Sequence, residues 1–250
     1  MVVAFVTGAS RGIGRAIALQ LADDGMDIAV AFSLRSKTDA FHTGQNSICL
    51  IGDVSQEAAV QAMIQSVVAY LGELNVMVAN AGIVVAKPML EVSVEEWDKV
   101  HAVNIRGVML CYREAAKQMI LQGKGGKILG ACSTAGFRGS SDAAAYSMSK
   151  WAVRGMSQAA ASEFAPYDIN VSYAPGPVDT NMWQEIDASI AERHGLKHGV
   201  AFAKSIEARS ALKRAQTPED IPNLVSFLAS AKARNITGQS VLCDAGINFS

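Results

Sequence analysis

Short apolar runs alternate with longer amphipathic stretches along the chain of 250 residues. Runs of about five apolar residues, rich in valine and isoleucine and bounded by glycine or polar residues, are typical of strands buried in a parallel sheet. The longer stretches carry apolar residues every three or four positions, which is typical of helices. The predicted strands cover residues 2–6, 27–32, 47–51, 75–79, 127–133, 168–173 and 239–243.

Most predicted strands are followed by a predicted helix, which is the order of an α/β domain. Ser55 is expected to cap the helix of residues 56–72, and Asn104 separates two helical stretches at residues 94–103 and 105–122. An asparagine inside a helix is costly unless it forms a hydrogen bond, so Asn104 either marks a kink or has a specific role. No repeat or change of composition divides the chain, and we therefore expect one domain.

The last third of the chain departs from this alternation. A polar stretch of helical pattern, at residues 179–216, follows the loop P-G-P-V-D-T and is predicted to form a lid. Thr217 as the cap and Pro218 at the first helical position are then expected to begin another helix before the final strand.

Composition and charge exclude several classes of function. Half of the residues are hydrophobic, and the formal net charge is −1 with both signs scattered, so no basic face for nucleic acid is expected. No apolar run reaches the ~18 residues of a membrane span, and the chain enters a strand without a signal-peptide pattern, so we expect a cytoplasmic protein. The cysteines lack C-x-x-C spacing and are predicted to be buried free thiols, namely Cys49, Cys111, Cys132 and Cys243.

The turn between the first strand and the first helix has the sequence T-G-A-S-R-G-I-G. Gly8, Gly12 and Gly14 would let backbone N–H groups approach a pyrophosphate at the positive end of the helix, where side chains would block them. A strand, a glycine-rich turn and a helix in this order predict a dinucleotide site.

The end of the second strand indicates which dinucleotide is bound. An acidic residue there usually holds the ribose of NAD, whereas this strand ends A-F-S-L-R-S-K, without an acid. Ser33, Arg35 and Lys37, together with Arg11, are candidates to surround the 2′-phosphate of NADP. The alternative is that Arg35 and Lys37 begin a solvated helix. We expect NADP(H), with NAD(H) as the alternative cofactor.

The stretch S-T-A-G-F-R-G-S-S-D-A-A-A-Y-S-M-S-K, residues 133–150, is the candidate chemical centre. Tyr146 and Lys150 stand one helical turn apart, so a lysine ammonium is expected to lower the phenol's pKa toward neutrality. The pair would then serve as a general acid and base. Ser133, at the end of an apolar run, is positioned to hold and polarise a carbonyl oxygen. This division of labour fits carbonyl reduction or alcohol oxidation.

Taken together, T-G-A-S-R-G-I-G, N-A-G at 80–82, Asn104, Ser133, Y-S-M-S-K and P-G at 175–176 resemble the short-chain dehydrogenase/reductase family across essentially the whole chain. The resemblance implies a Rossmann-like doubly wound sheet of seven parallel strands and a homotetramer or homodimer. It also implies a proton relay of Asn104, Ser133, Tyr146 and Lys150, in which Lys150 holds the nicotinamide ribose and Asn104 fixes a water.

The resemblance further implies a set of cofactor contacts around these motifs. Asp53 is expected to contact the adenine. Asn80 is also expected to contact the cofactor, whereas without the other motifs it would be interpreted as an ordinary turn residue. The full expected set is Gly8, Ser10, Arg11, Gly12, Ile13, Gly14, Ser33, Arg35, Asp53, Val54, Asn80, Ala81, Gly82, Tyr146, Lys150, Pro175, Gly176, Val178 and Thr180.

Within the family, the chain is similar to the meso-2,3-butanediol dehydrogenase and diacetyl (acetoin) reductase group, which acts on small diketones, hydroxyketones and diols. Members of that group usually take NADH and carry Asp where this chain has Phe32. Ser133, Tyr146 and Trp183 are expected to contact the substrate, although plain packing is the alternative for Trp183. His194 and His198 lack the glutamate of a zinc motif, so no metal is expected.

Two further functions remain open from the sequence. A non-catalytic NADP(H)-binding sensor is one, since a fold does not determine a function. A 3-oxoacyl thioester reductase is the other. The Tyr-Lys pair argues against the first and the bulky Trp183 against the second.

Overall fold

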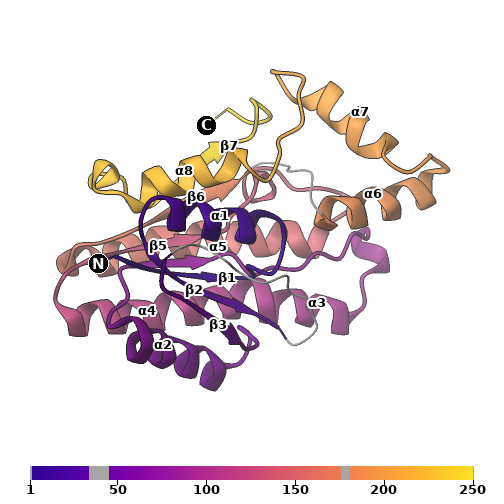
Figure 1. Ribbon diagram of the computed structural model, residues 1–250. Helices are drawn as coiled ribbons and strands as arrows, with labels where there is room; N and C mark the ends of the chain where they lie inside the picture. The colour runs from indigo at the N-terminus through magenta and orange to yellow at the C-terminus, as the bar shows by residue number, and fades with distance from the viewer. Residues whose placement is uncertain (1, 34–44, 176–180, 250) are drawn as a thin grey trace.

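The structure, a computed structural model, describes residues 2–33, 45–175 and 181–249. In these residues seven strands form one parallel sheet in the order β3-β2-β1-β4-β5-β6-β7 (Figure 1), which confirms the predicted α/β doubly wound fold. The strands are β1 (Val3–Thr7), β2 (Asp27–Phe32), β3 (Ser47–Ile51), β4 (Val76–Ala79), β5 (Gly126–Gly130), β6 (Ile169–Pro175) and β7 (Gln239–Cys243).

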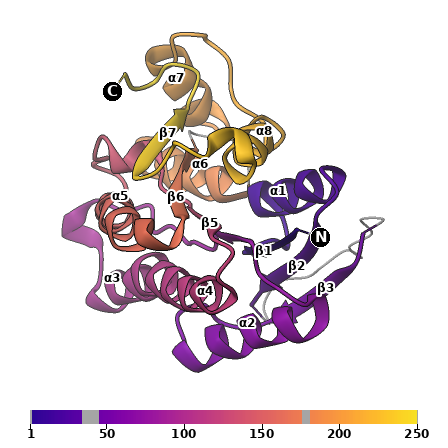
Figure 2. The same ribbon diagram turned by 90° about the vertical axis from the view of Figure 1, so that its left-hand side faces the viewer.

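Helices cover both faces of the sheet (Figure 2), with α1 and α8 on one face and α2, α4 and α5 on the other. Helices α6 and α7 stand outside these layers at one end of the molecule (Figure 1). None of the helices in the described ranges is long and apolar enough to cross a membrane. The helices are α1 (Gly12–Asp23), α2 (Glu57–Leu71), α3 (Val94–His101), α4 (Val108–Gln122), α5 (Ala144–Phe164), α6 (Asn181–His194), α7 (Val200–Arg209) and α8 (Asp220–Ala229).

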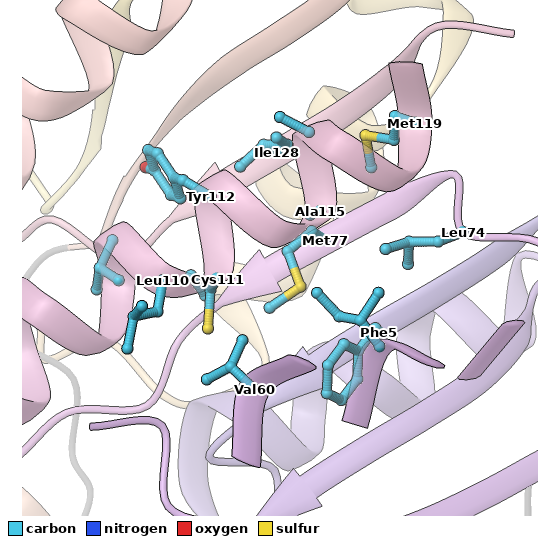
Figure 3. Close-up of a cluster of buried hydrophobic side chains, with 14 of the residues drawn as sticks. Phe5, Val60, Leu74, Met77, Leu110, Cys111, Tyr112, Ala115, Met119 and Ile128 are labelled. Atoms are coloured by element: carbon cyan, nitrogen blue, oxygen red, sulfur yellow. The ribbon is translucent and has the colours of Figure 1, made fainter. Parts of the chain in front are cut away.

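The core follows from the alternation of side chains along buried strands. Phe5 and Met77 are register partners on β1 and β4, so both point to the α2–α4 face (Figure 3), where Val60 and Leu110 pack against them. The alternate residues of the same strands, such as Val6 and its register partner Val78, pack on the opposite face under α1 and α8. Both faces of these central strands are therefore buried, which explains why β1 and β4 are almost entirely apolar.

Two predicted helix starts are wrong. Helix α2 begins at Glu57 after Gln56, and Ser55 lies in a preceding turn, where its N–H donates to Asp53 at 2.9 Å. Helix α8 begins at Asp220, because residues 217–220 first close a turn in which the Thr217 N–H donates to the Asp220 carboxylate at 2.9 Å. In both places an aspartate completes a local turn before the helix begins.

The predicted burial of the cysteines is only partly right. Cys111 and Cys132 are buried and Cys243 is half-buried, but Cys49 is exposed. Cys49 lies on β3, the edge strand of the sheet, whose burial alternates between exposed and intermediate residues. All four are free thiols, as predicted.

Candidate active site

The glycine-rich turn lies at the carboxyl end of β1, where the chain enters α1. Gly8 and Gly12 have φ of +68° and +56°, the left-handed region that favours glycine. Helix α1 begins at Gly12, and Arg11 before it makes no side-chain cap to the first-turn N–H groups. An uncapped helix N-terminus with a glycine entry is suited to bind a diphosphate.

Thr7 joins this turn to the N-A-G turn that follows β4, a role that sequence reasoning missed. Its hydroxyl oxygen accepts from the N–H groups of Asn80 and Ala81 at 3.1 and 3.2 Å, and the Asn80 amide donates to the Thr7 carbonyl at 3.0 Å. A Cβ on Gly14 would lie 2.5 Å from the Asn80 amide nitrogen. Asn80 therefore connects the two turns, and Gly14 leaves the room for it.

Asn104 lies in a π-helical turn, residues 102–107, between α3 and α4. The side chain is fully buried. Its oxygen accepts from the Ile83 N–H at 2.9 Å, and its amide donates to the Ile83 carbonyl at 2.9 Å and to the Ser149 hydroxyl at 3.0 Å. Asn104 thus marks an irregular turn and forms the hydrogen bonds that make an asparagine acceptable inside a helical stretch, while its part in a proton relay stays a prediction.

Ser149 links this turn to the helix that carries the Tyr-Lys pair. Its hydroxyl donates to the Tyr146 carbonyl at 2.7 Å and accepts from Asn104, and it is fully buried. The residue lies inside the motif Y-S-M-S-K, so its place one turn after Tyr146 was the signal available in the sequence.

Lys150 is buried, and only 3% of its surface is exposed. Its Nζ donates to the Ala131 carbonyl at 2.7 Å and lies 5.3 Å from the centre of the Tyr146 ring. Burial lowers the pKa of Lys150 to about 8. Gly82, from the N-A-G turn, is close to it, since a Cβ there would lie 3.6 Å from Nζ.

The expected lowering of the Tyr146 pKa by Lys150 is not found. Burial raises the pKa of Tyr146 to about 12, and a hydrogen bond with Ser133 acts in the opposite direction. The loss of hydration dominates this shift, while the Lys150 ammonium donates to the Ala131 carbonyl and lies over the ring, 5.3 Å from its centre. Tyr146 is therefore a protonated phenol near neutral pH, which is the form that donates a proton.

Ser133 follows β5 by three residues and stands beside Tyr146. Its backbone is extended, and its hydroxyl oxygen accepts from the Ala135 N–H at 3.2 Å, so the hydroxyl hydrogen can point elsewhere. Gly136 brings this loop against α5, since a Cβ there would lie 2.8 Å from the Lys150 carbonyl oxygen. The structure thus brings Ser133, Tyr146, Lys150 and Asn104 to one edge of the sheet.

The remaining predicted cofactor contacts lie along the carboxyl ends of neighbouring strands. Ser33 follows β2 and is exposed, and Asp53 follows β3 and is exposed. Val54 is buried against Gly107 of the π-helical turn. Ser10 and Ile13 lie in the glycine turn, and Pro175 ends β6 in register with Cys243. Arg35, Lys37, Gly176, Val178 and Thr180 lie outside the described residues.

Helices α6 and α7 pack against each other in the region predicted as a lid. The rings of Trp183 and Phe202 are 5.1 Å apart. Asp187, which is 2% exposed, accepts from the N–H groups of Gly199 and Phe202 and so caps α7 from α6. Burial alone would raise the pKa of Asp187, but these N–H groups hold it below its usual range. Whether Trp183 contacts a substrate stays a prediction.

Comparisons with known proteins show the family and the fold of this chain. The family model described as "Enoyl-(Acyl carrier protein) reductase" matches residues 8–248. A short-chain dehydrogenase/reductase of Armillaria gallica is 45% identical, covering 99% of this chain and 96% of its own. The L-2,3-butanediol dehydrogenase of Corynebacterium glutamicum is 40% identical, covering 99% and 98%. The crystal structure of an acetoin dehydrogenase from Salmonella typhimurium superposes with a TM-score of 0.81 at 28% identity, covering 99% and 97%.

Proposed function

The chain belongs to the short-chain dehydrogenase/reductase family of oxidoreductases, and we propose that it reduces small ketones with NADPH. The observation that carries the proposal is that a serine hydroxyl and a half-buried, protonated phenol lie together beside a buried lysine and the N-A-G turn. Such a pair of hydroxyls is suited to bind one carbonyl oxygen between them.

The residues around the glycine turn fit a nicotinamide dinucleotide. The turn of residues 8–14 would hold the diphosphate, Asp53 and Val54 the adenine, and Lys150 the ribose next to the nicotinamide. When bound, the nicotinamide supplies or accepts the hydride. The buried ammonium of Lys150, held at the Ala131 carbonyl, is poised to bind ribose hydroxyls.

Each residue of the proposed relay has a distinct part. Ser133, whose hydroxyl oxygen already accepts from the Ala135 N–H, donates its hydroxyl hydrogen to the substrate carbonyl and so orients it. Tyr146 donates its proton to the same oxygen as that oxygen gains negative charge. The positive charge of Lys150 stabilises the phenolate that remains, at 5.3 Å from the ring centre. Asn104 holds the first turn of α5 in place through Ser149.

NADPH is proposed over NADH because of the end of β2. Phe32 and Ser33 stand where an acid would hold the ribose of NAD, and neither side chain has a carboxylate. Arg11, in the glycine turn, is exposed, and its guanidinium lies 3.8 Å from the Glu185 carboxylate of α6. An exposed ion pair of this kind contributes little to the stability of the fold. The guanidinium is thus available to a 2′-phosphate. NAD(H) remains the alternative cofactor.

Small diketones and hydroxyketones are the proposed substrates. The support is the 40% identity with a protein named L-2,3-butanediol dehydrogenase. Trp183, near the start of α6, is proposed as an apolar wall of the substrate site.

Cofactor binding and turnover test the proposal together. Fluorescence titration of the apo protein should show tighter binding of NADPH than of NADH, and the tighter cofactor should reduce diacetyl or acetoin. Tyr146→Phe should keep cofactor binding and lose at least roughly a hundredfold in turnover. Tyr167→Phe, at a half-exposed tyrosine after α5, is the matched control and should keep full turnover. Near-wild-type turnover by Tyr146→Phe would refute the assignment.

A further inference from the structure

Arg193, near the end of α6, contacts two loops at once. Its Nη1 donates to the Asp142 carboxylate at 2.7 Å, and its Nη2 donates to the Ala86 carbonyl at 2.9 Å. Ser189, one turn earlier on α6, also donates to the Ala86 carbonyl, at 2.7 Å. We name Arg193, Asp142, Ser189 and Ala86 the clasp.

The two loops joined by the clasp belong to the proposed substrate site. Ala86 follows the N-A-G turn after β4, and it lies three residues past Ile83, which is bound to Asn104. Asp142 lies between Ser133 and Tyr146, in the segment that connects β5 to α5. Because β4 and β5 are neighbours in a parallel sheet, both loops leave the same edge and flank the two hydroxyls.

The clasp is a strong contact for a helix that lies outside the layered core (Figure 1). The Arg193 and Asp142 side chains are only 23% and 27% exposed, and two guanidinium nitrogens donate to three acceptors, on Asp142, Ala86 and Ser189. A shielded, charge-assisted bond of this kind is about twice as strong as a neutral one. The link at the other end of α6, from Glu185 to Arg11, is long and solvated. Helix α6 is therefore held firmly at its Arg193 end.

We propose that the clasp closes the space between these two loops beside Ser133 and Tyr146, so that Arg193 determines specificity for short substrates. A carbonyl carbon held at Ser133 and Tyr146 carries two substituents. A long substituent that left the site between the two loops would have to pass beneath α6, where the clasp joins the loops. Short diketones and hydroxyketones need no such exit, whereas a 3-oxoacyl thioester does. This inference rests on the proposed function and narrows its substrate class.

A chain-length series of 2,3-diketones, from four to eight carbons, tests the clasp. In the wild type kcat/KM should fall at least roughly tenfold along the series, since an alkyl group without room loses its burial energy. Arg193→Ala should make kcat/KM depend less on chain length, with roughly a tenfold higher kcat/KM for the longest diketone. For the shortest diketone the variant should have a higher KM at a similar kcat. Arg193→Lys, which keeps a charge for Asp142, should restore part of the wild-type profile.

Matched controls separate the clasp from general damage to α6. Glu192→Ala removes an exposed charge at the neighbouring position and should leave the chain-length profile unchanged. Ser189→Ala weakens the clasp without removing a charge and should flatten the profile less than Arg193→Ala. If the Arg193 variants do not fold, Ser189→Ala and Asp142→Asn carry the same test.

Two results would overturn the proposal, and neither is the failure of the proposed function itself. The first is an unchanged ratio of long to short substrates in folded Arg193→Ala. The second is unchanged hydrogen exchange at residues 83–88 and 189–194 in that variant, which would show that the clasp does not hold the loops. A wild type that binds NADPH but reduces no ketone would refute the proposed function instead, and the exchange result would still decide the clasp.

Discussion

Lys150→Met is expected to raise the free energy of unfolding at pH 7 while it removes most of the turnover. The ammonium is 3% exposed, and burial lowers its pKa from 10.5 to about 8. That shift corresponds to roughly 3 kcal/mol of destabilisation of the folded state whenever the lysine is charged. The lost hydrogen bond to the Ala131 carbonyl offsets about 2 kcal/mol of it. The expected net gain is about 1 kcal/mol at pH 7.

The pH dependence makes this prediction specific. Below pH 8 the lysine is charged in both the folded and the unfolded chain, so the wild type bears the full destabilisation. Between pH 8 and 10.5 the folded protein loses the proton while the unfolded chain keeps it, and the wild type becomes more stable as the pH rises. The difference in the free energy of unfolding between the methionine variant and the wild type should therefore fall by about 2 kcal/mol between pH 7 and pH 10 and change sign.

Urea denaturation of the apo proteins at pH 7 and pH 10 measures the difference, because other titrating groups cancel between wild type and variant. Lys232→Met, at an exposed lysine, should show no such pH dependence. Turnover by Lys150→Met should fall at least roughly a hundredfold, since the phenolate of Tyr146 loses its counter-charge. A stability difference that stays constant between pH 7 and pH 10 would refute the assigned burial cost.

Two further predictions concern the lid region and the glycine turn. Asp187→Ala should destabilise α7 by about 3 kcal/mol, because it removes the carboxylate that accepts from Gly199 and Phe202, and hydrogen exchange of α7 should rise locally. Since the pKa of Asp187 is lowered, its contribution is present at neutral pH and should be lost only below about pH 4. Gly14→Ala should weaken dinucleotide binding, because the new methyl group would lie 2.5 Å from the Asn80 amide nitrogen. Gly155→Ala is the control, since a Cβ there meets nothing within 4 Å, and it should instead stabilise α5 by about 0.5–1 kcal/mol. Equal cofactor affinity in the two glycine variants would contradict the assigned crowding at Gly14.

The strands and the order of the motifs were predictable from the sequence for a physical reason. A central strand that is buried on both faces must be apolar, which made β2 visible, and the edge strands β3 and β7 also have the predicted bounds because their short apolar runs end at polar residues or glycine. The glycine turn was equally visible, because only glycine adopts the φ of Gly8 and Gly12 freely. Helix starts were less predictable, since the carboxylates of Asp53 and Asp220 accept from the N–H groups of Ser55 and Thr217 in local turns that precede the helices. The oligomeric state and the cellular location stay predictions.

The sequence by itself determined the fold class, the family and the residue types of the site, because these depend on periodicity and on motifs contiguous along the chain. Only the tertiary structure decided the environment of each group. It placed Lys150 against the Ala131 carbonyl and removed much of the water around the Tyr146 phenol, which reversed the expected direction of the tyrosine pKa. It also paired Arg193 with Asp142, 51 positions apart. Burial and long-range contacts of this kind arise when distant segments pack together, and no local pattern specifies them.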